Sequence, residues 1–354
     1  MVLVLCACAL TSSALAQPSP APDRYATAYE RYTDAACPIP ADGIRHFVYF
    51  ARDREALRDH PFLSNDRFRG AQIMYAWKNL EVAEGQYDFS EIEEDYAYLL
   101  ARGKRLFVQL QDATFSLERH AIPDYLRDVR YDGGEFLQRD DEGRIVGWVA
   151  KRWNGRVQER FARLLDALGA QFDGRIEGIN LQETAIEIRV RNGRDSAYTH
   201  EAYVAGVQAN MRAMRAAFPR STTLQYANFM PGEWLPGMDK GRLRSVYQYG
   251  EEIGVGLGAP DLMVRRQGQL NHALAMMHEG TYTVPLGIAV QDGNYAEATW
   301  EADLQSPNGS GEGPRRSIVP LLHAFAADFL RVDYMFWVNQ APYFEEEVFP
   351  CFTE

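Results

Sequence analysis

The most informative stretch of this sequence is Ile176-Glu-Gly-Ile-Asn-Leu-Gln-Glu183. Its apolar residues are typical of a short buried strand, and the strand ends in the carboxylate of Glu183. In a closed barrel of parallel strands, the C-terminal ends of the strands carry the catalytic groups. The stretch therefore predicts a barrel strand that delivers Glu183 to the active face as a candidate general acid or base.

Strand-like and helical segments alternate along the rest of the chain, which indicates a parallel sheet covered by helices. The expected strands are 44–50, 71–77, 105–111, 176–183, 222–228, 254–258, 284–291 and 332–338. The expected helices are 90–103, with Ser90 as its cap, 156–172, 199–218, 241–252, 268–279 and 315–330. Eight such units in 354 residues predict an α/β fold, a single (β/α)8 TIM barrel over residues 41–354.

Two long insertions follow predicted strands and should therefore lie on the C-terminal face of the barrel. Residues 112–153 contain a Gly-Gly pair and a charged turn, which predict a small hairpin over that face. Residues 292–314 are rich in glycine and serine and predict a flexible loop.

The N-terminus has the features of a targeting segment. Residues 1–16 are apolar and end in Ala14-Leu-Ala16, which is typical of a signal peptide, and residues 17–40 form a Pro-rich lead-in. The segment Leu5-Cys-Ala-Cys8 also resembles a lipid-attachment site. We therefore expect a secreted or periplasmic protein, with a lipid anchor as the alternative and no other membrane contact.

The cysteines and the net charge of the chain indicate which covalent links, metals and binding partners to expect. Cys37 and Cys351 lie near the two ends of the exported chain, so a single disulfide is expected, with two free thiols as the alternative. No cysteine or histidine spacing indicates a metal site, and no cofactor is expected. A net charge of −12 argues against nucleic acid as partner and favours a neutral substrate, unless a local basic pocket overrides the overall charge.

Two neighbouring segments have the pattern of a known enzyme family: Trp77-Lys-Asn-Leu-Glu81 and Glu84-Gly-Gln-Tyr-Asp-Phe-Ser90. These segments resemble the second-strand region of the clan A barrel glycoside hydrolases, and residues 103–109, 256–261 and 336–338 are similar to later strands of that family. The resemblance covers most of residues 44–340. It implies hydrolysis of O-glycosidic bonds in an oligo- or polysaccharide, with retention, by two carboxylates that follow the fourth and seventh strands.

The sequence departs from the family at both carboxylates. The family has asparagine directly before the acid, whereas here Asn180 precedes Glu183 by three positions. The family nucleophile is a glutamate, whereas here Asp292 follows the seventh strand. We expect Glu183 as acid/base and Asp292 as its partner, although Glu183 could instead form a salt bridge and Asp292 could simply form a turn. The other candidates for the partner are Glu297, Glu301, Asp261 and Asp112.

Side chains at the predicted strand ends are candidates for sugar binding. Aromatic rings there can stack on sugars, and amides, carboxylates and hydroxyls can bind sugar hydroxyl groups. Trp337 is the strongest aromatic candidate, while Trp234 and Trp300 lie on loops. The expected substrate-binding residues are Trp77, Gln111, Asp112, Gln182, Tyr226, Asn228 and Trp337. Two other functions stay open, a glycan-binding barrel without catalysis and a polysaccharide lyase.

Overall fold

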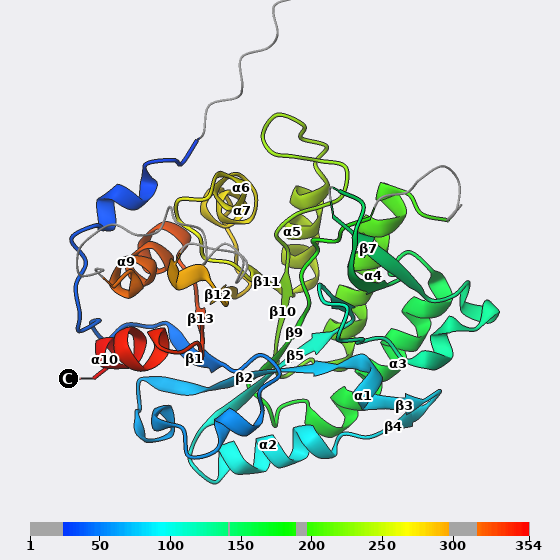
Figure 1. Cartoon of the computed structure of the whole chain (residues 1–354), viewed down its shortest axis with the longest axis horizontal. Coiled ribbons are helices and arrows are strands. Elements are labelled where there is room, and N and C mark those ends of the chain that lie inside the picture. Colours follow the sequence, from blue (N-terminus) through cyan, green and yellow to red (C-terminus); the bar gives the residue numbers. More distant parts are fainter. Residues whose placement is uncertain (1–23, 141, 189–196, 297–316, 354) are drawn as a thin grey trace, which may run out of the picture.

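Eight parallel strands close into a barrel in the order β1-β13-β12-β11-β10-β9-β5-β2 (Figure 1). The computed structural model describes residues 24–140, 142–188, 197–296 and 317–353. The barrel strands are β1 (Arg45–Tyr49), β2 (Phe68–Ala76), β5 (Arg105–Gln111), β9 (Gly178–Leu181), β10 (Thr222–Tyr226), β11 (Gly256–Ala259), β12 (Leu286–Val290) and β13 (Tyr334–Val338). All eight expected strands are confirmed, and the chain has the predicted (β/α)8 fold. The predicted signal peptide lies outside the described residues.

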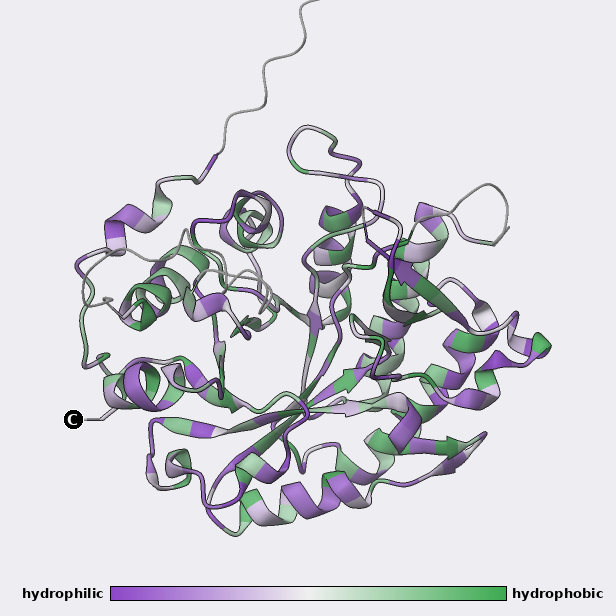
Figure 2. Cartoon of the chain, viewed as in Figure 1, coloured by the Kyte–Doolittle hydropathy of each residue, from purple (hydrophilic) through white to green (hydrophobic). Residues whose placement is uncertain are grey.

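Helices surround the strands (Figure 1). They are α2 (Ser90–Leu100), α3 (Gly155–Phe172), α4 (His200–Ala217), α5 (Arg242–Ile253), α6 (Gln267–Asn271), α7 (Ala273–Glu279), α9 (Val319–Ala324) and α10 (Phe349–Cys351). Hydrophobic and hydrophilic residues alternate along them, as expected for helices with one face on the barrel (Figure 2). Two details differ from expectation. His272 divides the helix predicted over 268–279, and α2 begins with Asp88 accepting from the Ser90 amide instead of a cap by the Ser90 hydroxyl.

Aromatic side chains fill the interior of the barrel. Phe47 and Phe336 lie 5.7 Å apart between ring centroids, and Phe107 packs edge-on against both. Closer to the C-terminal ends of the strands, the Gln72 amide donates to Asn180 Oδ1 and to the Tyr226 hydroxyl, each at 3.0 Å. Because side chains alternate along a strand, these contacts identify which residues of each strand point inward.

The first insertion forms a three-stranded antiparallel sheet of β6 (Ala113–Thr114), β7 (Glu135–Arg139) and β8 (Ile145–Ala150). The predicted hairpin is therefore confirmed as β7 and β8. Its Gln138 side chain accepts from the Glu187 amide at 2.8 Å, and the Arg139 amide donates to the Glu187 carbonyl at 2.8 Å. The sheet thus lies beside the loop that carries Glu183. None of the described helices has the length and apolar character that a membrane crossing requires.

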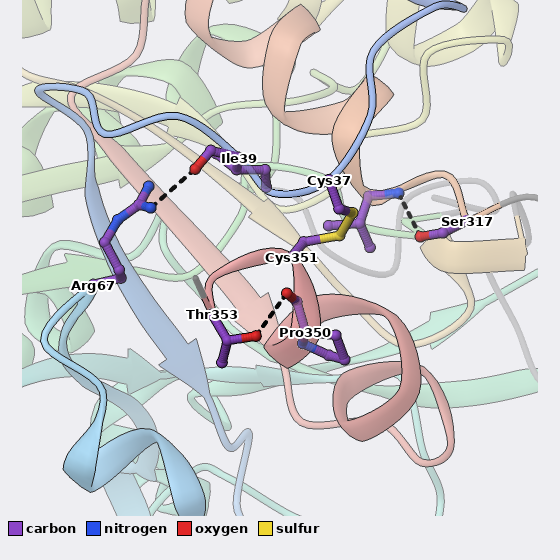
Figure 3. Close-up of a disulfide and its surroundings, with 8 residues drawn as sticks. Cys37, Ile39, Arg67, Ser317, Pro350, Cys351 and Thr353 are labelled. Carbon is purple, nitrogen blue, oxygen red and sulfur yellow. Dashed lines mark hydrogen bonds between the residues drawn. A yellow bond between two sulfur atoms is a disulfide. The ribbon is translucent and has the colours of Figure 1, made fainter.

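A disulfide between Cys37 and Cys351 joins the two ends of the barrel domain (Figure 3). The Cα atoms are 4.7 Å apart, and the Ile39 amide donates to the Cys351 carbonyl at 2.8 Å. Arg67 holds the same segment by donating to the Ile39 carbonyl at 2.9 Å. The expected disulfide is confirmed.

Reduction of this disulfide should lower the free energy of unfolding. The chain-entropy model gives about 5–6 kcal/mol for so long a loop, as an upper figure. Before reduction, the unfolded protein should show the same number of reactive thiols as the double variant Cys37→Ser/Cys351→Ser. Two additional thiols in the unreduced wild-type protein would contradict the pairing.

Candidate active site

Glu183 follows β9 at the C-terminal end of the barrel, where the sequence places it. Its Oε2 accepts a hydrogen bond of 2.7 Å from Asn228 Nδ2, which follows β10. The oxygen of the same Asn228 amide accepts from the backbone amides of Ala185 and Phe229 at 3.1 and 2.9 Å. These two donors fix the orientation of the amide, so its NH2 group must face Glu183.

A buried ion pair holds the backbone at Glu183. Arg152 donates to the Glu183 carbonyl and to the Tyr203 hydroxyl, each at 2.8 Å. The same guanidinium binds both oxygens of Asp112, at 2.7 and 2.6 Å. Because both oxygens of Asp112 are engaged and its side chain is buried, we assign Asp112 a positioning role in place of the predicted sugar binding.

The environment of Glu183 favours its protonated form. Burial, together with the nearby negative charge of Asp261, raises the pKa of Glu183 to about 7, although the Asn228 hydrogen bond and the Arg152 charge oppose the shift. Burial likewise raises the pKa of Asp261 to about 6, against a hydrogen bond of 3.2 Å from Asn294. Two interacting carboxyl groups with raised pKa values therefore lie at the ends of β9 and β11.

Tyr49 joins this group from the end of β1. Its position two residues after the inward-facing Phe47 places it on the same face of the strand, nearer the barrel mouth. Burial raises the pKa of the Tyr49 hydroxyl far above its usual value; Arg52 opposes the shift, while the charges of Asp292, Glu183 and Asp261 add to it. The hydroxyl therefore stays protonated and can donate a hydrogen bond. Sequence analysis missed Tyr49, although the alternation along β1 contains the signal.

Asp292 lies two residues after the end of β12 and is exposed. Its loop is tied to the rest of the site, because the Gly293 amide donates to Gln340 at 3.0 Å and Asn294 binds the Gln291 amide at 2.8 Å. The NH2 group of Asn294 donates to Asp261, so one residue connects the loop of Asp292 with Asp261. Glu297, Glu301 and Trp300 lie outside the described residues.

The two tryptophans expected at the sugar site lie elsewhere. Trp337 is 0% exposed, and its indole N–H donates to His46 Nδ1 at 3.2 Å. It points out of the barrel because its neighbour Phe336 points in. Trp77 is also buried, donating to Glu81 at 2.8 Å and packing on Phe161 of α3. Both rings therefore pack the barrel wall, and this placement replaces their expected role in sugar stacking.

Of the remaining predicted residues, two make structural contacts and two lie at the candidate site. Gln182 accepts from the backbone amides of Asp112 and Ala113, so it holds the end of β5. Tyr226 is buried inside the barrel with its hydroxyl bound to Gln72. Asn228 contacts Glu183 directly, and Gln111 lies at the end of β5 with its carbonyl oxygen bound to Arg52. Of the predicted polar set, Asn228 and Gln111 best fit substrate contact.

An exposed aromatic pair lies next to Asn228. Trp234 is 54% exposed, and its ring stacks on Phe229 with centroids 5.7 Å apart and planes 10° from parallel. The His272 ring packs against both, with centroids 4.6 Å from Phe229 and 4.7 Å from Trp234. Because Phe229 follows Asn228 directly, this pair offers an aromatic surface close to Glu183.

One cluster outside the barrel mouth has the composition of a metal site. Ligand atoms of Asp42, His46 and His323 lie within 4.8 Å of one another. The Trp337 indole always donates, so His46 Nδ1 must accept and the His46 proton lies on Nε2, which faces Asp42 at 3.5 Å. A metal on that Nε2 would put the proton on Nδ1, against the indole N–H. His323 Nε2 and Asp42 Oδ2 share a hydrogen bond of 2.5 Å, so the cluster fits a histidine–carboxylate contact better than a metal site.

Two solved structures that resemble this chain are a β-amylase domain and a xylanase. The catalytic domain of a β-amylase from Paenibacillus polymyxa is 8% identical, covers 85% of this chain and 93% of its own, and has a TM-score of 0.55. A xylanase from Paenibacillus barcinonensis is 11% identical over 93% of this chain and 92% of its own, with a TM-score of 0.45. No protein-family model and no curated protein sequence matches the chain. The first likeness confirms the barrel fold.

Proposed function

We propose that the protein is a glycoside hydrolase that cleaves an O-glycosidic bond in an oligo- or polysaccharide. The observation that carries this proposal is the pair of interacting carboxyl groups, Glu183 and Asp261, with pKa values raised to about 7 and about 6 at the barrel mouth. Glycoside cleavage requires one protonated and one ionised carboxyl group at the same pH. The fold that this chain shares with a β-amylase supports the same conclusion.

Glu183 is the proton donor in this mechanism. Its protonated carboxyl donates to the glycosidic oxygen as the bond breaks, and the Asn228 amide orients the carboxyl group. The ionised form that results is stabilised by the same Asn228 NH2 group and by the charge of Arg152. Tyr49, which stays protonated, can donate to a sugar hydroxyl or to the partner carboxylate.

The second carboxylate attacks the anomeric carbon or activates water. Asp292 is the partner that the family resemblance implies, because it follows the seventh barrel strand. Asp261 is favoured by the electrostatics, because its charge raises the pKa of Glu183 and its own raised pKa suits a base near neutral pH. We therefore propose Asp261 as the base or nucleophile and keep Asp292 as the alternative.

The direct test is release of reducing sugar from a panel of polysaccharides. Wild-type protein should hydrolyse at least one of them, and the Glu183→Gln variant should serve as the inactive control. Binding without any release of reducing sugar would instead favour a glycan-binding barrel without catalysis. A polysaccharide lyase would release a product with an unsaturated ring, which absorbs in the ultraviolet.

Trp234→Ala should weaken substrate binding and leave the fold intact. The exposed ring lies next to the residues that hold Glu183, and loss of an aromatic surface typically costs about 0.5–1.5 kcal/mol beyond its buried area. We expect KM to rise several-fold with a smaller change in kcat, measured on an oligosaccharide substrate. Trp337→Phe, which changes a ring in the barrel wall, provides the contrast, since it should lower stability and leave KM unchanged. An unchanged KM in folded Trp234→Ala would show that its ring lies outside the binding site.

We also propose that the protein acts outside the cytoplasm. The disulfide supports this placement, because disulfides persist in oxidising compartments. Fractionation of cells that express the full chain would locate it.

A further inference from the structure

An arginine without an acidic partner lies beside the proposed active site. Arg52 follows β1 after Ala51, whose backbone is left-handed at φ 48°, and it is half-buried. Its Nε donates to Gln111 Oε1 at 3.0 Å. It forms no ion pair with any residue in the described ranges, so its terminal NH2 groups are available to a ligand.

Gln111 adds a buried donor that has no partner. The side chain is 1% exposed, and its Nε2 makes no hydrogen bond with the described residues. A buried amide NH2 without an acceptor costs free energy, so such groups are rare in native structures without a ligand or water. Since Oε1 is held by Arg52, the NH2 group must point to the other side of the amide, where an acceptor is missing.

A second arginine strengthens the positive potential at this place. Burial lowers the pKa of Arg52; the charge of Tyr49 opposes the shift, and the charge of Arg119, in the exposed loop that follows β6, adds to it. All other described arginines with a resolved shift have raised pKa values, because each pairs with an acid. The positive charges of Arg52 and Arg119 therefore oppose each other in a protein of net charge −12. A bound anion would relieve their repulsion.

On the basis of the proposed function, we propose that Arg52 and the Gln111 amide form a subsite for an anionic substituent of the substrate sugar, a carboxylate or a sulfate, and that Arg119 adds to its positive potential. The planar guanidinium and the amide NH2 match the acceptors of such a group. The charge of Arg52 acts on the Tyr49 hydroxyl, which in turn lies in the field of the three carboxylates. The subsite is therefore close to the reacting bond, and the substrate is an acidic glycan.

An acidic substrate differs from the neutral one that the net charge of the chain favours. The net negative charge of the protein is an average over the surface, whereas recognition depends on the local field. Acidic side chains at the mouth come from β9, β11 and β12, while the two arginines and Gln111 follow β1, β5 and β6. Because β5 pairs with β9 in the barrel, the anion would bind next to the part of the rim that carries Glu183.

The test measures binding to the Glu183→Gln enzyme, so that turnover does not interfere. The ligands are matched pairs of oligosaccharides from pectin, alginate and glucuronoxylan, each in its acidic form and with its carboxyl groups reduced to alcohols. Sulfated galactan oligosaccharides and their desulfated forms provide the sulfate arm. Arg52→Gln and the exposed Arg119→Gln are added to the Glu183→Gln background, with Arg212→Gln on the outer face of α4 as the matched control.

At least one acidic ligand should bind more tightly than its neutral partner, and Arg52→Gln should weaken the acidic ligand alone by about 10- to 100-fold. Arg119→Gln should lower the same preference by a smaller factor that shrinks as salt rises. Arg212→Gln should change nothing. The pair that shows the preference identifies carboxylate or sulfate as the anion. If no pair shows a preference that Arg52→Gln or Arg119→Gln removes, the subsite is wrong, while hydrolysis of a neutral glycan by the wild-type enzyme would still support the proposed function.

Discussion

Glu183→Gln should lower kcat/KM on a natural glycan by about 10²- to 10⁴-fold, the usual contribution of a positioned general acid. Glutamine keeps the shape of the side chain and its contact with Asn228 but carries no transferable proton. The loss should be much smaller on an aryl glycoside with a good leaving group, because that bond needs little protonation. Comparison of the two substrates in the same variant measures this difference, and near wild-type turnover on the natural glycan would exclude Glu183 as the acid.

Replacement of the second carboxylate should produce a loss of similar size on both kinds of substrate. We expect Asp261→Ala to lose about 10²- to 10⁴-fold and Asp292→Ala to lose less. Azide should restore turnover of an activated glycoside in the variant whose missing carboxylate lies beside the anomeric carbon. Strong loss and azide rescue in Asp292→Ala alone would assign the role to Asp292, as the family resemblance implies.

The Asp261 variant also tests the electrostatic basis of the site. Burial raises the pKa of Asp261 to about 6, above the value of about 3.9 in an unfolded chain. The contribution of Asp261 to stability is therefore fully present below about pH 4, and it is lost as the pH rises through about 6. Asp261→Asn removes this penalty, so at pH 8 the variant should unfold at the same or a higher temperature than the wild type. Lower stability at pH 8 would show that the ionised carboxylate is better solvated than its surroundings indicate.

The barrel itself could be predicted from the sequence because its signal is local. Each strand is a short apolar run that ends before polar residues, and along each following helix the apolar residues recur with the helical period. The same positional rule placed Glu183 and Asn228 correctly at neighbouring strand ends. It failed for Trp337, because a position at a strand end does not say which side of the barrel wall the ring is on. The inward contacts of Phe336 decide that question.

The rest of the site depends on contacts through space. Asp261 was one of several candidates in the sequence, and its coupling to Glu183 appears only when β9 and β11 are brought to one rim. Asp112 looked like a ligand for sugar until Arg152, forty residues later, was found to occupy both of its oxygens. Arg52 and Gln111 come from strands that are separated by β2 in the barrel, so no spacing in the sequence could pair them.

The most direct test of the proposed acid and base is the pH dependence of kcat/KM for the wild type and Glu183→Gln. Activity requires Asp261 ionised and Glu183 protonated, so the wild-type profile should be bell-shaped, rising through about pH 6 and falling through about pH 7. In Glu183→Gln, measured on an activated glycoside, the fall above about pH 7 should disappear while the rise through about pH 6 remains. A fall at alkaline pH that persists unchanged in Glu183→Gln would contradict the assignment of Glu183 as the proton donor.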